Sequence, residues 1–118
     1  MKLKQFYEVL GGNYEKVLER FLGQKTMLYK YLMKFAADQS FVLLEEAVNE
    51  KDVKKVYYAA HTLRGVCANF DMFKLIAASN ELMNATRKGD AGSIDYLFPD
   101  VKKEYDIILD AIAHVDIS

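Results

Sequence analysis

The sequence predicts an all-α protein: an up-and-down antiparallel four-helix bundle with short additional N-terminal and connecting helices. One proline and six glycines are the only strong helix breakers in 118 residues. Apolar residues recur at steps of three and four over most of the chain, which is the spacing of one helix face. No segment alternates apolar and polar residues between turn signals, as a half-buried strand would. Helices joined by short loops pack antiparallel, which gives the bundle.

The N-terminal third is expected to hold one short helix and one long helix. Residues 2–10 form the short helix, which stops at the glycine pair 11–12. Asn13 then stands where the N-cap of the next helix belongs. Residues 14–37 carry one apolar stripe and predict a single helix of about 36 Å at about 1.5 Å per residue. The stripe consists of Leu18, Phe21, Leu22, Leu28, Tyr31, Leu32 and Phe35.

Two further helices follow, each with a polar residue in the capping position. Ser40 is the candidate N-cap of a short helix that ends near Lys51. Asp52 is the candidate N-cap of another long helix. The buried stripe of this long helix is expected to be Val56, Ala60, Leu63, Cys67 and Phe70. Cys67 therefore fits a small buried hydrophobe better than a redox group.

The C-terminal half continues the helical pattern after a break near Asp71. The next helix is expected to stop at Gly89, a residue suited to a helix C-terminus. Its expected buried stripe is Leu75, Ala78, Leu82 and Ala85. Residues 91–99 are expected to be a connector with at most a helical turn. The last helix carries the stripe Val101, Tyr105, Ile108, Ile112 and Val115.

Length and composition restrict the class of protein. Residues 1–118 are expected to form one domain, since a domain commonly has about 100–200 residues. With 16 basic and 17 acidic side chains the net charge is −1, so no strong field favours nucleic acid. A single cysteine excludes an internal disulfide framework. No apolar stretch approaches the roughly 20 residues of a membrane span. We expect a cytoplasmic monomer that binds neither nucleic acid nor a membrane.

His61 has the more unusual surroundings of the two histidines. It lies just off the buried stripe of its helix. Its neighbours at helical spacing are a cation, two very small residues and two tyrosines: Arg64, Gly65, Ala68, Tyr57 and Tyr58. A glycine within a helix costs about 1 kcal/mol relative to alanine, so Gly65 needs a reason. Either tight helix packing or the approach of a partner supplies one. The tyrosines fit core packing or a partner surface.

Enzyme sites of the usual kinds find little support in the sequence. No second histidine or carboxylate follows His61 at i+3 or i+4, so the spacing of a zinc site is missing. Nothing supplies a nucleophile with a base beside it, and no glycine-rich phosphate loop occurs. His114 fits a helix end, where the backbone dipole mildly favours a protonated imidazole. An ordinary surface histidine remains the simplest interpretation of His61 at this point.

Several segments carry a resemblance to a known family. Residues 60–70 read Ala-His-Thr-Leu-Arg-Gly-Val-Cys-Ala-Asn-Phe, which resembles the His-x-Leu-Lys/Arg-Gly signature of the histidine-containing phosphotransfer (HPt) family. Residues 81–90 read Glu-Leu-Met-Asn-Ala-Thr-Arg-Lys-Gly-Asp, which is similar to the family's leucine–acidic pair and Arg-x-Gly-Asp-like turn. Residues 10–13 and the apolar helix that ends at residues 34–35 are also similar to HPt N-terminal halves. The likeness therefore covers nearly the whole chain.

The resemblance implies a phosphocarrier of a bacterial two-component phosphorelay rather than an enzyme. His61 would accept a phosphoryl group from a receiver-domain aspartyl phosphate and pass it to another receiver. Arg64 would lie beside the phosphoryl oxygens, and Gly65 and Ala68 would leave room for the partner. That partner is a response regulator or a hybrid sensor histidine kinase. No cofactor of its own is implied, because the receiver supplies Mg²⁺. An unperturbed imidazole titrates near ~6.5 and is a competent nucleophile near pH 7.

Three positions depart from the family pattern. Asp71 stands where a glycine is usual, although aspartate tolerates left-handed backbone geometry better than most residues. Met83, the expected neighbour of the imidazole on the second helix, stands where an acidic or amide residue often hydrogen-bonds that ring. A thioether does this poorly, so something else must orient His61. Arg64 replaces the commoner lysine and adds a planar set of donors.

Two other functions remain open from the sequence. A phosphorylation-independent helical adaptor (pseudo-HPt) would keep the fold, bind partner proteins and lose the transfer. Met83 and Asp71 motivate this alternative. The other is a helical-bundle cofactor protein in which His61 is an axial haem ligand.

Overall fold

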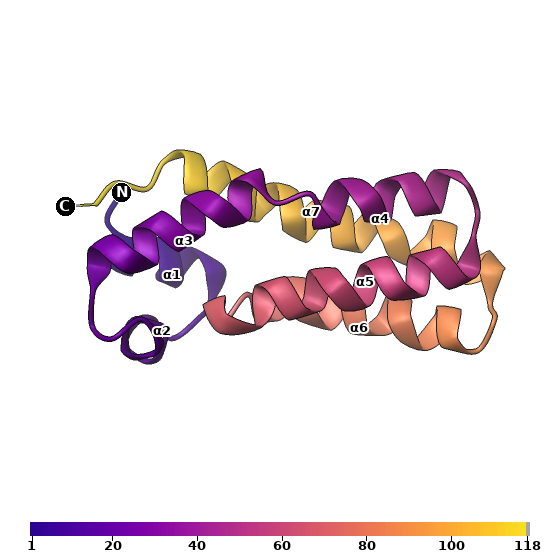
Figure 1. The fold of residues 1–118 in the computed structure, drawn as a ribbon, viewed down its shortest axis with the longest axis horizontal. Coiled ribbons are helices and arrows are strands. Elements are labelled where there is room, and N and C mark those ends of the chain that lie inside the picture. Colours follow the sequence, from indigo (N-terminus) through magenta and orange to yellow (C-terminus); the bar gives the residue numbers. More distant parts are fainter. Residues whose placement is uncertain (118) are drawn as a thin grey trace.

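The computed structural model describes residues 1–117, and these residues form helices and connecting turns without a strand. In chain order the elements are α1 (Leu3–Leu10), α2 (Tyr14–Arg20), α3 (Lys25–Ala37), α4 (Ser40–Asn49), α5 (Val53–Cys67), η1 (Ala68–Phe70), α6 (Phe73–Arg87), η2 (Ala91–Ser93) and α7 (Ile94–Ala113). They form an elongated body (Figure 1). Its principal extents are 45 × 21 × 19 Å.

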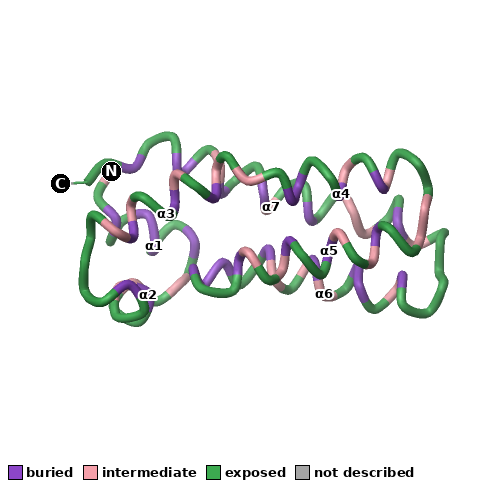
Figure 2. The backbone as a smooth tube through the Cα atoms, viewed as in Figure 1, coloured by how far each residue is buried: buried purple, intermediate pink, exposed green. Residues whose placement is uncertain are grey.

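The longer helices lie side by side along the long axis of the molecule (Figure 1). α4 packs on α5, α5 on α6 and α6 on α7, while α3 and α4 both contact α7. α1 and α2 gather at the end of the molecule where both termini lie. Buried positions recur along each helix and exposed positions alternate with them (Figure 2). The prediction of an all-α protein is confirmed for the described residues.

Aromatic side chains join the helices within the core. The rings of Phe41 in α4 and Tyr105 in α7 stack with centroids 4.0 Å apart. Phe70 in η1 stacks on Phe21, which follows α2, at 5.6 Å, and meets Phe35 of α3 edge-on at 5.9 Å. Because such pairs add about 0.5–1.5 kcal/mol beyond area burial, they fix the end of α5 against the N-terminal helices.

Several predicted caps and stops occur where the sequence placed them. Oδ1 of Asn13 accepts a hydrogen bond from the Lys16 amide at 3.0 Å and begins α2. Oδ1 of Asp52 accepts one from the Lys55 amide at 3.1 Å and begins α5. Gly89 has φ +76° and follows α6, as a left-handed C-terminal residue does. The predicted stripe of α5 is buried throughout: Val56, Ala60, Leu63, Cys67 and Phe70.

The prediction of one helix over residues 14–37 is wrong. The chain leaves helical geometry between α2 and α3, where Leu22 has φ +60° and Gly23 has φ +71°. The Gly23 amide donates to the Leu18 carbonyl at 2.9 Å, a hydrogen bond that closes the end of a helix. In Figure 1 α2 is seen nearly end-on while α3 runs along the molecule. Of the two stripe residues at the break, Phe21 is buried although it is not helical, whereas Leu22 is 74% exposed.

Two other boundaries differ from the prediction. Ser40 is the first residue of α4 rather than its cap, and its amide donates to Oδ1 of Asp38 at 2.7 Å. Residues 94–99 belong to α7, so most of the expected connector is helical. Pro99 lies inside this helix and lacks the N–H that would bond the Asp95 carbonyl. Both residues are exposed, so water can bond that carbonyl instead.

The buried face of α6 is rotated relative to the predicted stripe. Leu75 and Leu82 are buried as expected, but Ala78 and Ala85 are only half-buried. The remaining buried positions are Ser79, Met83 and Thr86. Two of these side chains are polar, so apolar periodicity could not identify them. None of the helices within residues 1–117 combines the length and apolarity needed to cross a bilayer.

Candidate functional site

The imidazole of His61 is exposed on α5. The helix turns Ala60 and Leu63 into the core, which leaves His61 on the outer side. Among residues 1–117 no protein group forms a hydrogen bond or ion pair with the imidazole. Its ring neighbour is Tyr57, one turn earlier, with centroids 6.4 Å apart and planes inclined by 39°. The ring nitrogens of His61 are therefore accessible to an incoming group.

Gly65 lies one turn beyond His61, and no internal packing requires it. A Cβ atom added to Gly65 would have no heavy atom within 4 Å. Tight helix packing, one of the two reasons the sequence allowed, is thus excluded as the reason for this glycine. Ala68, the first residue of η1, is also exposed. Together His61, Gly65 and Ala68 form a strip of α5 and η1 that has little side-chain cover beside the imidazole.

Arg64 links this part of α5 to α6. Its Nη1 atom donates a hydrogen bond to Oδ1 of Asn80 at 3.2 Å, and the side chain is half-buried. A guanidinium carries five N–H donors, so this bond leaves others free to bind oxygen atoms of a ligand. Asn80, which the sequence did not single out, holds the cation in place. The sequence could not predict this role of Asn80, because Arg64 and Asn80 lie on different helices that only the fold brings together.

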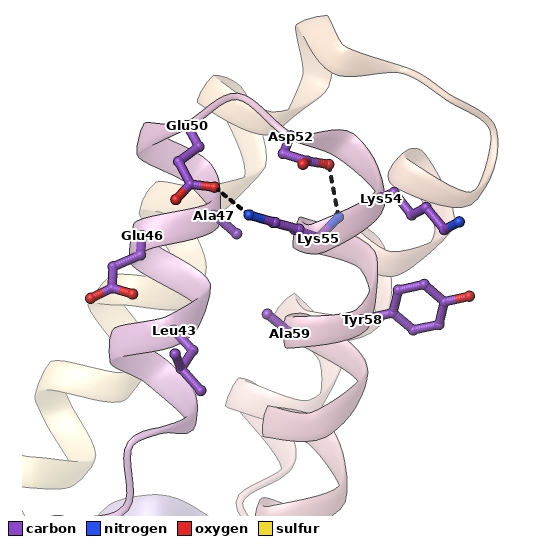
Figure 3. A pocket seen from close by; sticks show the side chains of 9 residues that line it. All are labelled: Leu43, Glu46, Ala47, Glu50, Asp52, Lys54, Lys55, Tyr58 and Ala59. Atoms are coloured by element: carbon purple, nitrogen blue, oxygen red, sulfur yellow. Dashed lines mark hydrogen bonds and ion pairs between the residues drawn. The ribbon is translucent and has the colours of Figure 1, made fainter.

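The two tyrosines near His61 have different surroundings. Tyr58 is 58% exposed and points away from α4 (Figure 3). Tyr57 is half-buried and meets the ring of Tyr58 edge-on, with centroids 5.3 Å apart. The guanidinium of Arg87, at the end of α6, lies over the ring of Tyr57 at 5.8 Å from its centroid. Tyr58 is thus a surface residue, whereas Tyr57 lies between His61 and α6.

Met83 and Asp71, two of the three positions that depart from the HPt pattern in the sequence, are both buried. Met83 is 2% exposed and belongs to the core. Asp71 adopts φ +52° and ψ +36°, the left-handed conformation that a glycine would take. Its carboxylate accepts a hydrogen bond from Nη1 of Arg20 at 2.7 Å and another from the Asn13 amide at 3.3 Å. The turn between α5 and α6 is therefore retained without glycine.

The other residues with reactive side chains lie away from this strip. Cys67 is fully buried, and burial, with a smaller effect from Asp38, raises the pKa of its thiol to about 12. The thiol therefore stays protonated at neutral pH, in agreement with the prediction of a small buried hydrophobe. His114 follows α7, and its Nδ1 atom lies 2.8 Å from the Asp110 carbonyl oxygen, as expected for a helix end.

A groove between α4 and α5 was not predicted from the sequence. Figure 3 shows Leu43 and Ala47 of α4 facing Ala59 of α5 across it, and the groove has a volume of about 560 Å³. An ion pair between Nζ of Lys55 and a carboxylate oxygen of Glu50, 3.0 Å long, bridges its end. The one sequence feature that could have indicated this groove is Leu43, an apolar residue off the buried stripe of α4. Its side chain is 56% exposed.

Comparisons with known proteins assign no function to this site. A scan against protein-family models, a search of curated proteins and a search of solved structures each found no match. Within residues 1–117, no three His, Cys, Asp or Glu side chains form a group suited to a metal ion. The features that remain are an exposed imidazole, an oriented guanidinium and bare backbone at Gly65.

Proposed function

We propose that this chain is a histidine phosphotransfer protein of a two-component phosphorelay and that His61 is its phosphoacceptor. The observation that carries the proposal is the exposed imidazole beside a helical glycine whose missing side chain opens onto free space. A glycine that destabilises its helix and packs against nothing inside the molecule is explained by a partner that approaches there. The proposed architecture is the up-and-down four-helix bundle typical of HPt domains. In it, α3 and α4 together form the first long arm of the bundle, and α5, α6 and α7 are the other three helices.

The proposed reaction is the transfer of a phosphoryl group between an aspartate and His61. The lone pair of one imidazole nitrogen attacks the phosphorus of a receiver's aspartyl phosphate. The nitrogen–phosphorus bond forms as the phosphorus–oxygen bond breaks, and the aspartate carboxylate leaves with the electron pair. The other ring nitrogen keeps its proton, so the ring gains a positive charge beside the phosphoryl oxygens. The reverse step returns the group to the same or another receiver.

Arg64 is proposed to stabilise the negative charge on the transferred group. Asn80 accepts a hydrogen bond from one N–H of the Arg64 guanidinium. Arg64 lies one turn from His61 on the same helix, so its other N–H donors are near the imidazole. A cation placed in advance lowers the barrier because it is not reorganised during the reaction. In-line geometry, Mg²⁺ and the remaining acceptor groups are proposed to come from the receiver. The chain would then act as a cytoplasmic, monomeric carrier without a nucleotide site of its own.

Incubation with phosphorylated receiver domains tests this proposal. Receivers charged with acetyl phosphate are mixed with the chain, and phosphate on the chain is measured with its acid and alkali stability. We expect acid-labile, alkali-stable phosphate that the His61→Gln variant lacks. The matched control is His114→Gln, which removes the other histidine, bonded to its own helix end, and should retain full labelling.

The same experiment separates the alternatives. Equal binding of a receiver to the wild type and to His61→Gln, with no phosphate on either, would establish the adaptor and overturn the transfer. The core position of Met83, a residue that cannot hydrogen-bond an imidazole well, is the observation that favours this second candidate. A haem absorption band after expression with added haem, lost in His61→Gln, would establish the axial-ligand alternative instead.

A further inference from the structure

Phosphoryl transfer requires a ring nitrogen of His61 to point at the phosphorus atom. Misalignment of reacting atoms is costly, because much of the rate of such a step comes from orientation. No hydrogen bond within residues 1–117 fixes the imidazole, and Met83, on the neighbouring helix, is buried in the core. The orientation of the imidazole must therefore come from another contact.

Tyr57 provides a contact of suitable geometry. Its ring centroid lies 6.4 Å from that of His61, within the range of about 4.5–7 Å at which aromatic rings interact. The two residues are four apart on α5, so their side chains lie on the same helix face. The half-buried ring of Tyr57 occupies one side of the imidazole and limits the rotations open to it.

Arg87 in turn restricts Tyr57 from a different helix. Its guanidinium lies 5.8 Å from the centre of the Tyr57 ring, a cation–π arrangement between α6 and α5. Arg87 is the last residue of α6, because the left-handed Gly89 follows and the Asp90 amide donates to the Ala85 carbonyl at 3.0 Å. The stop of α6 thus places Arg87 beside Tyr57. The Tyr58 ring, edge-on to Tyr57 at 5.3 Å, supports it from another side.

We propose that Tyr57 is the positioning residue for the His61 imidazole and that Arg87 holds Tyr57 in place. This inference rests on the proposed phosphotransfer function and assigns to Tyr57 the orienting task that a hydrogen-bonding residue in place of Met83 would perform. Tyr57 acts through its aromatic ring, and its hydroxyl group is not required. This role of Arg87 differs from that proposed for Arg64, which is to bind the phosphoryl oxygens.

Two measurements on the full chain test the inference. NMR of the free protein reports the χ1 rotamer populations of His61, from three-bond couplings, and the ratio of its two neutral tautomers, without any phosphodonor. Phosphoramidate then supplies a phosphoryl group without a receiver: its phosphorus–nitrogen bond breaks, ammonia leaves, and the bond to the imidazole forms. The variants are Tyr57→Leu, Tyr57→Phe and Arg87→Gln. Tyr96→Leu, at a position 81% exposed on α7, and Lys88→Gln are the matched controls.

We expect Tyr57→Leu to spread His61 over more χ1 rotamers and to slow phosphorylation about fivefold, the factor implied by an aromatic contact of about 1 kcal/mol. Tyr57→Phe should keep the wild-type rotamer populations and rate, and Arg87→Gln should fall between the two. Wild-type rotamer populations in Tyr57→Leu, or their loss in Tyr57→Phe, would overturn the inference. If receivers and phosphoramidate both fail to label the wild type, the proposed function fails separately, while the NMR comparison still decides whether Tyr57 orients His61.

Discussion

At the scale of single residues, Gly65 lowers the stability of α5 and leaves the space beside His61 open. Its backbone is helical, and the space beside it is open. An alanine would fit without any internal contact and would have the higher helix propensity. Stability alone would therefore favour alanine at this position, whereas a partner that approaches the imidazole would favour glycine.

Replacement of Gly65 by alanine is expected to raise stability and lower transfer together. The free energy of unfolding should rise by about 0.5–1 kcal/mol, measured by urea denaturation. Transfer from a phosphorylated receiver should fall by about tenfold, because the added methyl group costs roughly 1.4 kcal/mol at the interface. The control Ala77→Gly, at an exposed position of α6, should lower stability by a similar amount and leave transfer unchanged. A Gly65→Ala variant with undiminished transfer would contradict the proposed docking at this strip.

Sequence spacing was sufficient to place His61, Arg64 and Gly65 on one part of a helix, since those relations are local. It could not assign Asn80 to Arg64 or Arg87 to Tyr57. Both pairs join α5 to α6, and which side chains meet depends on how the two helices are rotated about their axes. The expectation that Met83 neighbours the imidazole stays a prediction.

At the scale of elements, α6 buries polar side chains that its pattern did not reveal. The Thr86 hydroxyl donates to the Leu82 carbonyl at 2.8 Å, so its burial is compensated within the helix. The Ser79 hydroxyl is fully buried and has no hydrogen-bond partner among residues 1–117. A buried hydroxyl without a partner is destabilising, because its contact with water is lost and not replaced.

Replacement of Ser79 by alanine is therefore expected to stabilise the protein. The substitution removes the hydroxyl without a partner and improves helix propensity, so the free energy of unfolding should rise by about 0.5–1 kcal/mol. Urea denaturation measures the change. Thr86→Val, which removes a satisfied hydroxyl from the same buried face, should give no such gain. Destabilisation by Ser79→Ala would show that the hydroxyl has a favourable partner.

Boundaries were the least predictable property of the elements. Asn13 and Asp52 were recognised because a cap depends on residues only three apart. The break between α2 and α3 was missed because Leu18, Phe21 and Leu22 keep helical spacing, although Leu22 and Gly23 both leave helical geometry. The start of α7 was missed because Pro99 was taken to end a connector, whereas its position in an exposed part of the helix allows it.

At the scale of the whole molecule, Asp71 connects the N-terminal helices to the turn between α5 and α6. Its buried carboxylate binds Arg20 at the end of α2 and the Asn13 amide at its start. Gly12 permits this close approach, since a Cβ there would lie 2.9 Å from a ring carbon of Tyr7 and 3.0 Å from the Asp71 carbonyl oxygen. The junction fixes α1 and α2 against the end of the bundle.

Replacement of Asp71 by alanine is expected to cost about 3 kcal/mol of stability. The variant loses a charged hydrogen bond. It also places alanine, which adopts the left-handed conformation less readily than aspartate, at φ +52°. Asp71→Asn should cost about half as much, because asparagine tolerates this geometry and still accepts hydrogen bonds. Urea denaturation gives both values, and hydrogen exchange should show the largest loss of protection in α1 and α2. Equal losses in the two variants would contradict this account of the junction.

The sequence by itself determined the helical class, most of the caps and the position of His61 off the buried stripe of α5. These features depend on residues within one or two turns of each other, so spacing is enough to reveal them. Only the tertiary structure decided that Gly65 faces open space, that Asn80 holds Arg64, that Arg87 lies over Tyr57 and that Asp71 binds Arg20. The last three join segments that are distant in the sequence, and the first depends on what packs nearby. Helix rotation and packing in the folded chain set all four, and periodicity along a single helix carries no information about them.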